Sequence, residues 1–511
     1  MPDPDADESS ATLGESAPTV LVGIVAGSAL ALAAETYIAR SLSPDVYGAL
    51  ALAYTLIYGV SMLAGHSIGD AVARTLSGVN GHTPGQILAS GLVIAGGLGL
   101  ALIGGGYLAR EQLAQLAGEP ALARYLPWLL PIGLVYPAGR VFGGMIQADT
   151  NARAEITVRH LLPRTAGILV LGAGSLAGAS LLGAVSYWLL YPLGILAGGV
   201  GYLVVGDRLT PTIHWPDRRA FGEVWGQAWP LAASASMFTL LSSLDVLMIG
   251  VFASSQEVGY YRAIRPLRQS TTFLLSAFSF AFLPMATRQF DNDRIGRLGQ
   301  LFGTSTKWVV TATLPLTSVF VLYPEAVVHL LYGPTYSPAA PALAALAGGL
   351  FVRTLTGLDG DLVKAIDRPR VELWTGAIGV AGNVLVNAWL IPRLGIVGAA
   401  IGTAVGYGVY NLLELAAIYR ATGIQPFSWA IVRIATLVGA TAAAIRWLTG
   451  PDVGVFTLSV VGVLVGIVAV CALLVGGDLT TEEMGALRRL EQRTGVSLAW
   501  MVPGQPSDIR S

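Results

Sequence analysis

Apolar stretches of about 20 residues follow one another along almost the whole chain, separated by short polar segments and by turns rich in proline and glycine. A helix of about 20 apolar residues is long enough to cross the hydrocarbon core of a bilayer. The pattern therefore predicts an all-α integral membrane protein with about 14 transmembrane helices. The expected spans are residues 19–39, 46–73, 85–109, 125–148, 160–176, 181–206, 224–252, 258–287, 298–322, 339–363, 371–391, 395–419, 427–448 and 454–476.

The composition agrees with a chain that lies mostly inside a membrane. Of the 511 residues, 54% are apolar and 12% are charged, and the mean hydropathy is +0.64. Soluble proteins carry about 25% charged residues. The net charge of −1 provides no basic stripe for nucleic acid, so we expect no nucleic-acid partner. The single cysteine, Cys471, lies in an apolar run, which excludes a disulfide framework and a cysteine zinc site.

The charges of the loops predict the orientation of the spans. If the N-terminus is cytoplasmic, the cytoplasmic loops and tail carry 17 basic residues and the outer loops carry four. Cytoplasmic loops are enriched in Lys and Arg, so we expect a multi-pass protein of the cell membrane with both termini in the cytoplasm. The acidic segment 1–18 lacks the basic start of a signal peptide and is expected to be a disordered cytoplasmic tail. Residues 477–511 form the second expected cytoplasmic tail.

A short sequence occurs twice, each time directly after a span. Asp45-Val46-Tyr47-Gly48 follows the first span, and Glu257-Val258-Gly259-Tyr260 follows the seventh. Transporters are often built from duplicated halves, and the six-span separation predicts two six-helix lobes followed by a helix pair. The expected boundaries are 19–206 for the N-lobe, 207–223 for a cytoplasmic linker, 224–419 for the C-lobe and 427–476 for the C-terminal helix pair.

The short loops argue against an enzyme. The longest outer connections, near 110–124 and 323–338, hold only about 15 residues, too few for the sugar-donor domain that a membrane glycosyltransferase or polymerase needs. We therefore expect a transporter. Asp359-Gly360-Asp361 has the Asp-x-Asp form of a metal site, but it lies inside the tenth expected span and is not expected to bind a metal.

Four motifs, taken in order, resemble the polysaccharide-transporter branch of the multidrug/oligosaccharidyl-lipid/polysaccharide flippase superfamily. They are Leu42-Ser43-Pro44-Asp45-Val46-Tyr47-Gly48, its copy after the seventh span, Lys364-Ala365-Ile366-Asp367-Arg368-Pro369-Arg370, and the stretch LIPRLGIVGAAIGTAVGY at 390–407. The resemblance covers about residues 19–476. It implies a flippase that moves polyprenyl- or dolichyl-phosphate-linked oligosaccharide from the cytoplasmic to the outer leaflet by alternating access, for surface polysaccharide or glycoprotein assembly.

The resemblance also implies partners. These are the lipid-linked oligosaccharide and membrane lipids, with glycosyltransferases of the same pathway as further candidates; no cofactor is expected, and sodium or proton coupling stays open. Two alternatives remain: a cation-coupled multidrug exporter of the same superfamily, and a membrane polymerase or ligase that acts on lipid-linked glycan. A pump for organic cations would have an acidic, aromatic cavity, whereas the excess charge inside these spans is basic.

Basic residues inside the spans are the candidates for substrate binding. A charge at the bilayer centre costs at least about 2.5 to 3.5 kcal/mol, so such a residue is expected to face a wet cavity or a partner. Three arginines of the eighth span recur every three residues and share one helical face, and guanidinium groups bind phosphate well. The expected cavity residues are Arg262, Arg265, Arg268, Arg353, Lys307 and Arg140. The alternative for the three arginines of the eighth span is contact with anionic lipid head groups or pairing with Asp245 and Glu257.

Acidic and amide residues suggest two further interactions. Asp70 and Arg74 are four residues apart, which predicts a local ion pair. Asn383 and Asn387 share a face of the eleventh span and, with Asp245 and Thr403, offer four oxygen donors that suit sodium. The pattern is similar to the sodium site of peptidoglycan-precursor flippases of this superfamily, in which the second position of the eleventh span is Asp, so Asn387 removes one charge. The alternative is that the asparagines only hydrogen-bond between helices and that Asp245 pairs with an arginine of the eighth span.

Overall fold

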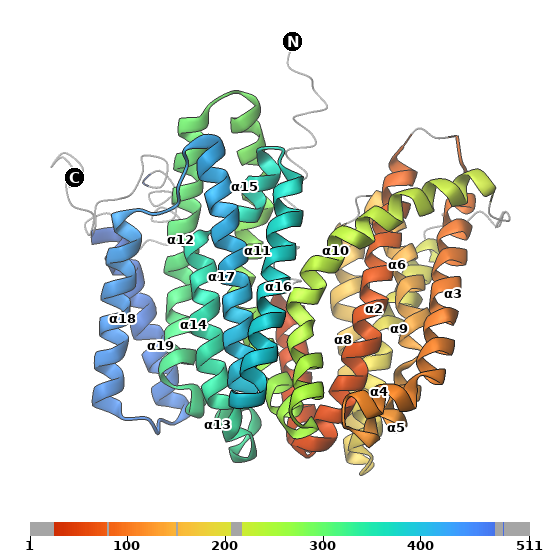
Figure 1. Cartoon of the computed structure of the whole chain (residues 1–511), viewed down its shortest axis with the longest axis horizontal. Helices are drawn as coiled ribbons and strands as arrows, with labels where there is room; N and C mark the ends of the chain where they lie inside the picture. The colour runs from red at the N-terminus through yellow and green to blue at the C-terminus, as the bar shows by residue number, and fades with distance from the viewer. Residues whose placement is uncertain (1–24, 79–80, 150–151, 206–216, 476–483, 485–511) are drawn as a thin grey trace. The chain divides into compact units, whose positions relative to one another are not determined.

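The structure is a computed structural model, and it describes residues 25–78, 81–149, 152–205, 217–475 and 484. All regular structure in these ranges is helical, and they contain no strand (Figure 1). The predicted fold class, an all-α integral membrane protein, is thereby confirmed. Apart from residue 484, the two expected tails, 1–18 and 477–511, lie outside the described residues.

Each of the predicted spans coincides with helix in the described part of the chain. Among the described residues, ten helical segments are long and apolar enough to cross a membrane. The first span is helical over 25–41. The others are α2 (Pro44–Ser77), α3 (Pro84–Leu108), α5 (Pro120–Leu129) with α6 (Ile132–Ala148), α8 (Leu162–Leu176), α9 (Ser180–Val205), α10 (Arg218–Phe252), α11 (Ser255–Asp291), α12 (Ile295–Leu322), α14 (Ala340–Thr356) with α15 (Asp359–Ala365), α16 (Pro369–Leu394), α17 (Ile396–Thr422), α18 (Trp429–Thr449) and α19 (Val455–Val475).

The connections contain helical structure that hydropathy does not reveal. Two connections were expected on the outer side: the one near 110–124 contains α4 (Arg110–Leu116), and the one near 323–338 contains α13 (Pro324–Tyr332) and the 3-10 helix η2 (Pro334–Ala339). Between α6 and α8 lie α7 (Ala152–Ile156) and the π-helical turn η1 (Thr157–Leu161). In α13, proline at the first helical position and Glu325 in the first turn favour helix initiation.

Two of the predicted spans are each formed by two consecutive helices. The fourth is divided at Pro131, between α5 and α6, where proline supplies no N–H group. The tenth is divided after α14 at Gly357, whose φ of 74° is readily adopted by glycine alone. At Pro131 the backbone keeps helical dihedral angles, so the fourth span remains one continuous rod, whereas at Gly357 the backbone leaves the helical conformation.

The chain divides into two compact units. One comprises Met1–Pro266 with Asn387–Ala399, and the other comprises Leu267–Val386 with Ala400–Ser511. In the first unit, α2 packs along both α6 and α10, and α3 and α9 also pack on α6 (Figure 1). The predicted lobe boundaries, 19–206 and 224–419, stay a prediction.

Glycine allows α2 and α6 to approach closely. A Cβ atom at Gly144 would overlap the carbonyl oxygen of Gly69, and a Cβ at Gly69 would lie 2.7 Å from the carbonyl oxygen of Arg140. Small residues at helix contacts permit such backbone proximity in membrane proteins. Tyr136 and Arg140 of α6 consequently pack their side chains directly against α2, next to Gly65.

The two copies of the repeated turn contact each other within the first unit. A Cβ at Gly48 would overlap the carbonyl oxygen of Ser255, and a Cβ at Gly259 would overlap that of Pro44. The contact is reciprocal, because Ser255 lies 211 residues after Pro44 and Gly259 lies 211 residues after Gly48. The sequence motifs themselves align at a separation of 212 residues, one more than this contact, and the internal duplication stays a prediction.

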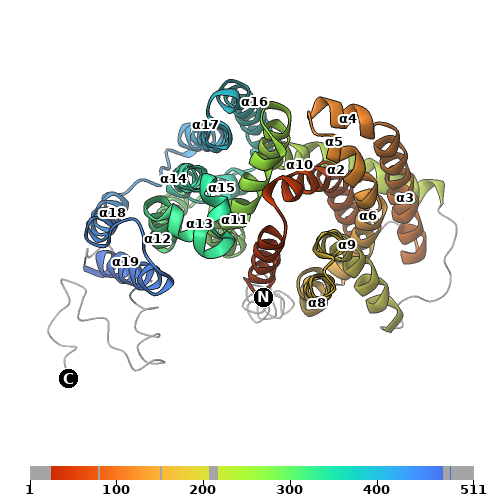
Figure 2. The ribbon, with the colours of Figure 1, turned by 90° about the horizontal axis from the view of Figure 1, so that it is seen from below.

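In the second unit, α12 is the central helix of an apolar cluster. It packs on α14, α18 and α19, and Figure 2 shows α18 and α19 side by side next to α12. The cluster includes Val310, Leu314, Ile434, Val438, Val461 and Val465. The C-terminal helix pair is therefore joined to its unit by apolar packing.

Candidate functional site

Arg262, on α11, forms an ion pair with the acidic residue of the first span. Its Nη2 lies 2.8 Å from Oε1 of Glu35. Glu35 also accepts hydrogen bonds from the Tyr47 hydroxyl at 2.7 Å and from the Trp188 indole at 3.2 Å. A carboxylate with three donors on three helices is a fixed structural group. The carboxylate that pairs with Arg262 is therefore Glu35. It is neither Asp245 nor Glu257, the two acidic partners considered for the arginines of the eighth span.

Aromatic rings surround the same ion pair. The guanidinium of Arg262 lies 5.2 Å from the ring centre of Tyr54 and 5.6 Å from that of Trp188. Tyr54 and Trp188 are 4.6 Å apart, so the rings limit access of water to the ion pair. Sequence reasoning assigned no role to Glu35; the available signal was a carboxylate within the first apolar span.

The other predicted cavity residues of α11 and α12 lie on continuous helices. Arg265 is partly exposed, and Arg268 is only 9% exposed, so the three-residue spacing on one face of α11 holds. Lys307, on α12, is 5% exposed. Arg268 and Lys307 belong to the second unit and Arg265 to the first. Their assignment to a substrate cavity stays a prediction.

Arg353 lies in the last turn of α14, four residues before the break at Gly357. Its guanidinium lies 4.8 Å from the ring centre of Tyr407, on α17. A guanidinium that stacks on the face of an aromatic ring keeps its positive charge, and its N–H groups still point outward at the edge of the ring. The assignment of Arg353 to a substrate cavity stays a prediction.

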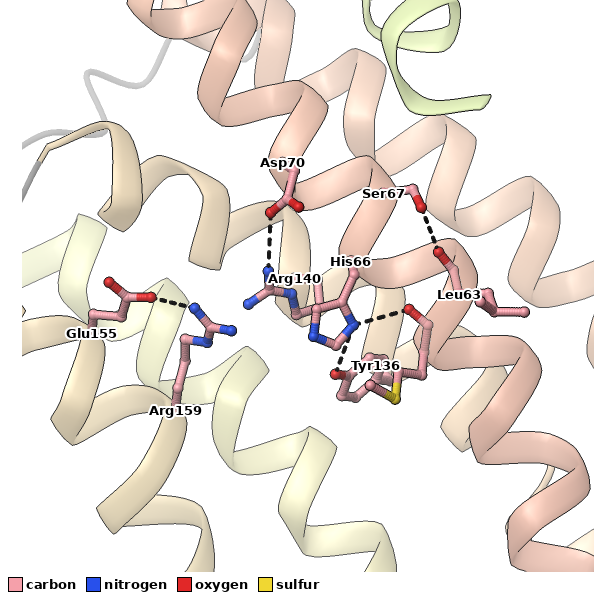
Figure 3. A network of polar contacts seen from close by, with 9 residues as sticks. Leu63, His66, Ser67, Asp70, Tyr136, Arg140, Glu155 and Arg159 are labelled. Atoms are coloured by element: carbon pink, nitrogen blue, oxygen red, sulfur yellow. Dashed lines mark hydrogen bonds and ion pairs between the residues drawn. The ribbon is translucent and has the colours of Figure 1, made fainter. Parts of the chain in front are cut away.

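Arg140 lies in α6 and is 2% exposed. Its Nη2 lies 3.5 Å from Oδ1 of Asp70, on α2, whereas Nε and Nη1 have no hydrogen-bond partner (Figure 3). The sequence predicted that Asp70 would pair with Arg74 in its own helix, and the structure pairs it with Arg140 instead. The reason is the close approach of α6 to α2 at Gly69, which a helical repeat does not reveal.

The four residues of the predicted sodium site are all fully buried. Asp245 accepts a hydrogen bond from the Tyr261 hydroxyl at 2.7 Å and one from its neighbouring backbone N–H at 2.8 Å. Asp245 and Asn387 belong to the first unit, and Asn383 and Thr403 belong to the second. The sodium site therefore stays a prediction.

Two buried carboxylates of the second unit lie near each other, a relationship that the sequence did not reveal. Asp359, on α15, is 5% exposed, and Glu414, on α17, is fully buried, with no hydrogen-bond partner for either carboxylate oxygen. A Cβ at Gly360 would lie 3.6 Å from Oε2 of Glu414. Within the described residues, no group of three or more His, Cys, Asp or Glu side chains could hold a metal ion.

In the part of the chain that the structure describes, ten apolar helices and buried ion pairs inside the spans are typical of a multi-pass membrane protein of the transporter class. The chain belongs to the polysaccharide biosynthesis protein family, whose model matches residues 15–290. The resemblance that the sequence motifs indicated is thereby confirmed.

Named relatives and solved structures agree with this assignment. A probable low-salt glycan biosynthesis flippase of Haloferax volcanii, Agl15, is 22% identical over 405 residues, which cover 79% of this chain and 82% of the relative. The lipid II flippase MurJ, in an inward closed conformation, has a TM-score of 0.74 at 12% identity and covers 88% of this chain and 98% of its own. An inward-facing multidrug resistance MATE transporter has a TM-score of 0.64 at 14% identity, covering 79% and 98%. These proteins are flippases and transporters, in agreement with the prediction that the chain is not an enzyme.

Proposed function

We propose that the protein is a flippase for lipid-linked oligosaccharide. Its substrate carries a polyprenyl or dolichyl phosphate or diphosphate, and it is moved from the cytoplasmic to the outer leaflet by alternating access. The glycan flippase similar to this chain over 79% of its length supports the substrate class. The product serves the assembly of surface polysaccharide or glycoprotein.

The observation that carries the proposal is the presence of basic side chains within the spans of a flippase-like fold. Arg140 is 2% exposed and two of its guanidinium nitrogens have no hydrogen-bond partner, and Arg353 presents its guanidinium over an aromatic ring. A charged group inside a membrane is expensive unless it is paired or binds a ligand. A phosphate or diphosphate head supplies the matching negative charge, and arginine binds it with two parallel hydrogen bonds.

The second candidate is a cation-coupled exporter of drugs, because a MATE transporter shares the fold. The sign of the cargo's charge distinguishes the two functions. A cavity for an organic cation requires unpaired carboxylates facing it. Glu35 is already held by Arg262, Tyr47 and Trp188, so in the first unit this carboxylate is committed to internal contacts.

The proposed orientation places both termini in the cytoplasm. A reporter enzyme fused to the C-terminus of the full chain is expected to be active on the cytoplasmic side. Activity outside the cell would invert the direction of transport that we propose.

Reconstitution tests the function directly. The full chain is placed in proteoliposomes with fluorescent polyprenyl-diphosphate oligosaccharide, and a membrane-impermeant reagent measures how much substrate reaches the opposite leaflet. We expect translocation that exceeds the rate of protein-free vesicles, and no efflux of an organic cation such as rhodamine 6G. Cation efflux without lipid translocation would contradict the flippase function and support the exporter function.

We also propose that sodium drives transport through Asp245, Asn383, Asn387 and Thr403. Oxygen donors suit a hard cation, and all four side chains are shielded from water. Because only Asp245 is anionic, the site is expected to bind sodium weakly.

A further inference from the structure

Charged side chains gather around Arg140 in the first unit. His66 and Asp70 come from α2, Arg140 from α6, Glu155 from α7, and Arg159 from the π-helical turn η1 (Figure 3). The cluster therefore joins three parts of the chain that are separated by up to 93 residues.

Arg140 has more hydrogen-bond donors than acceptors around it. A guanidinium carries five N–H groups, yet its one contact with a carboxylate, Asp70, is 3.5 Å long, at the limit of a hydrogen bond. Nε and Nη1 are buried without a partner. Burying such donors is costly unless a ligand accepts them.

The side chain of Arg140 has little freedom to move away. It lies near the middle of α6 (Ile132–Ala148), and its stem is packed against α2, since a Cβ at Gly65 would lie 3.2 Å from Cγ of Arg140. The guanidinium is therefore held inside the unit.

Arg159 faces Arg140 across the cluster. Figure 3 shows the two guanidinium groups turned toward each other, with Glu155 on the far side of Arg159. Arg159 forms an ion pair with Glu155, four residues earlier. The charge of Arg159 acts on Arg140, and the charge of Asp70 acts on it with the opposite sign. Two facing positive charges repel each other, and an anion between them would turn this repulsion into two attractions.

Within the cluster, the guanidiniums of Arg140 and Arg159 balance the carboxylates of Asp70 and Glu155. Arg164, which contacts His160 beside Arg159 in η1, supplies one further positive charge next to the cluster. Arg164 contacts His160 at 3.4 Å and the ring of its neighbour Tyr191 at 5.4 Å, so it adds to the positive potential from the side. With Arg164 counted, one positive charge remains to match a negatively charged ligand.

We infer that Arg140 and Arg159 form a binding site for a phosphate or diphosphate group. The inference rests on the proposed function in that the group belongs to the lipid carrier of the substrate, although a phospholipid head group has the same chemistry. In the expected orientation, the connection that carries Arg159 is cytoplasmic, and this is the side on which the flippase takes up its substrate.

Binding of inorganic pyrophosphate to the purified full chain tests the site, with the shift of the thermal unfolding midpoint as the measurement. The wild-type chain should be stabilised in a saturable manner. Arg140→Gln and Arg159→Gln should each bind pyrophosphate at least about tenfold more weakly, because each removes charged hydrogen bonds. Wild-type affinity in both variants would overturn the inference.

Arg446→Gln is the matched control. Arg446 also lies in an apolar helix, α18, but its Nε donates to the carbonyl oxygen of Leu322 at 2.8 Å and its guanidinium lies 5.4 Å from the ring of Tyr323. This variant should bind pyrophosphate like the wild type, and an equal loss there would mean that the ion acts through general charge. If Arg140→Gln does not fold, Arg159→Gln decides, because the Arg159 side chain is 22% exposed and tolerates replacement better.

Competition identifies the source of the phosphate. Nanodiscs of phosphatidylcholine containing either polyprenyl phosphate or phosphatidylglycerol are compared as competitors of pyrophosphate. Stronger competition by polyprenyl phosphate assigns the site to the carrier, and equal competition assigns it to phospholipid head groups. No competition by either lipid would overturn the assignment to a lipid phosphate.

The site and the proposed function can fail separately. If pyrophosphate binding depends on Arg140 but the protein does not translocate lipid-linked oligosaccharide, the flippase function is refuted and the anion site is retained. If the protein translocates the substrate but its Arg140→Gln and Arg159→Gln variants bind pyrophosphate normally, the anion site is refuted and the flippase function is retained.

Discussion

Gly48 of α2 and Gly259 of α11 meet backbone to backbone, so neither position has room for a Cβ atom. The contact joins the two copies of the repeated turn, and each glycine leaves room for the backbone of the other copy. Two helices can pack this closely only where neither carries a side chain at the crossing.

Substitution of these glycines should destabilise the fold. Gly48→Ala and Gly259→Ala each force the helices apart and should lower the free energy of unfolding by about 1–3 kcal/mol. Thermal unfolding in detergent measures the effect. Gly104→Ala, in α3, has nothing within 4 Å of the added atom and should be neutral or slightly stabilising; equal effects in all three variants would contradict the explanation.

The Glu35–Arg262 ion pair should be energetically coupled. Glu35→Gln leaves a guanidinium without its charged partner and should cost about 3 kcal/mol of stability, because removing one member of a buried pair strands the other. Adding Arg262→Gln should recover part of that loss. A double-mutant cycle of unfolding free energies checks this, and simple additivity of the two substitutions would mean that the pair contributes no coupling.

Arginines of the predicted cavity should be needed for transport and not for insertion. Replacing Arg265, Arg268 and Arg353 by Ala should abolish translocation in proteoliposomes while the amount of protein in the membrane is unchanged. Lys should restore only part of the activity, because an ammonium cannot make the bidentate contacts of a guanidinium. Full translocation by the triple Ala variant would exclude these residues from substrate binding.

Sodium should stimulate transport if the predicted cation site is occupied. Translocation is compared in sodium and in choline media. The stimulation should disappear in Asp245→Asn and in Thr403→Val, since each removes an oxygen donor. Equal rates in the two media for the wild-type chain would exclude a coupling role for Asp245 and leave it with structural contacts such as the hydrogen bond from the Tyr261 hydroxyl.

Removing one carboxylate from the Asp359–Glu414 pair should stabilise the second unit. Glu414 is fully buried and its oxygens have no hydrogen-bond partner, so Glu414→Gln removes a desolvated carboxylate beside another acid and should raise the thermal unfolding midpoint by a few degrees. Asp452→Asn, at an exposed position, serves as the control. A lower midpoint for Glu414→Gln would mean that the carboxylate is required as it stands.

Hydropathy predicted the helices well because the thickness of the bilayer fixes their length. It did not predict where a span is interrupted. The break at Gly357 depends on one backbone dihedral angle, and the division at Pro131 lies within a stretch that remains apolar on both sides. A window average treats these residues like any other small or apolar residue.

The charged residues were identified from the sequence, but most of their partners were not. Glu35 and Arg262 are 227 residues apart, and Asp70 and Arg140 are 70 apart. Helical spacing relates only residues within a few turns, so it suggested Arg74 as the partner of Asp70. Long-range pairs follow from which helices touch, and that depends on glycine positions such as Gly69.

The π-helical turn η1 carries one residue more than an α-helical turn of the same length. Deletion of a single residue from Thr157–Leu161 would convert this wide turn into a regular α-helical turn. Because the wide turn already absorbs the extra residue, the helix after it would keep its orientation, and Gly167 of α8 would stay against the ring of Tyr187 on α9. The turn itself would be reshaped, and with it the position of Arg159 opposite Arg140. A one-residue gap at this point in a homologous sequence would therefore leave the packing of α8 intact and change the charge cluster alone.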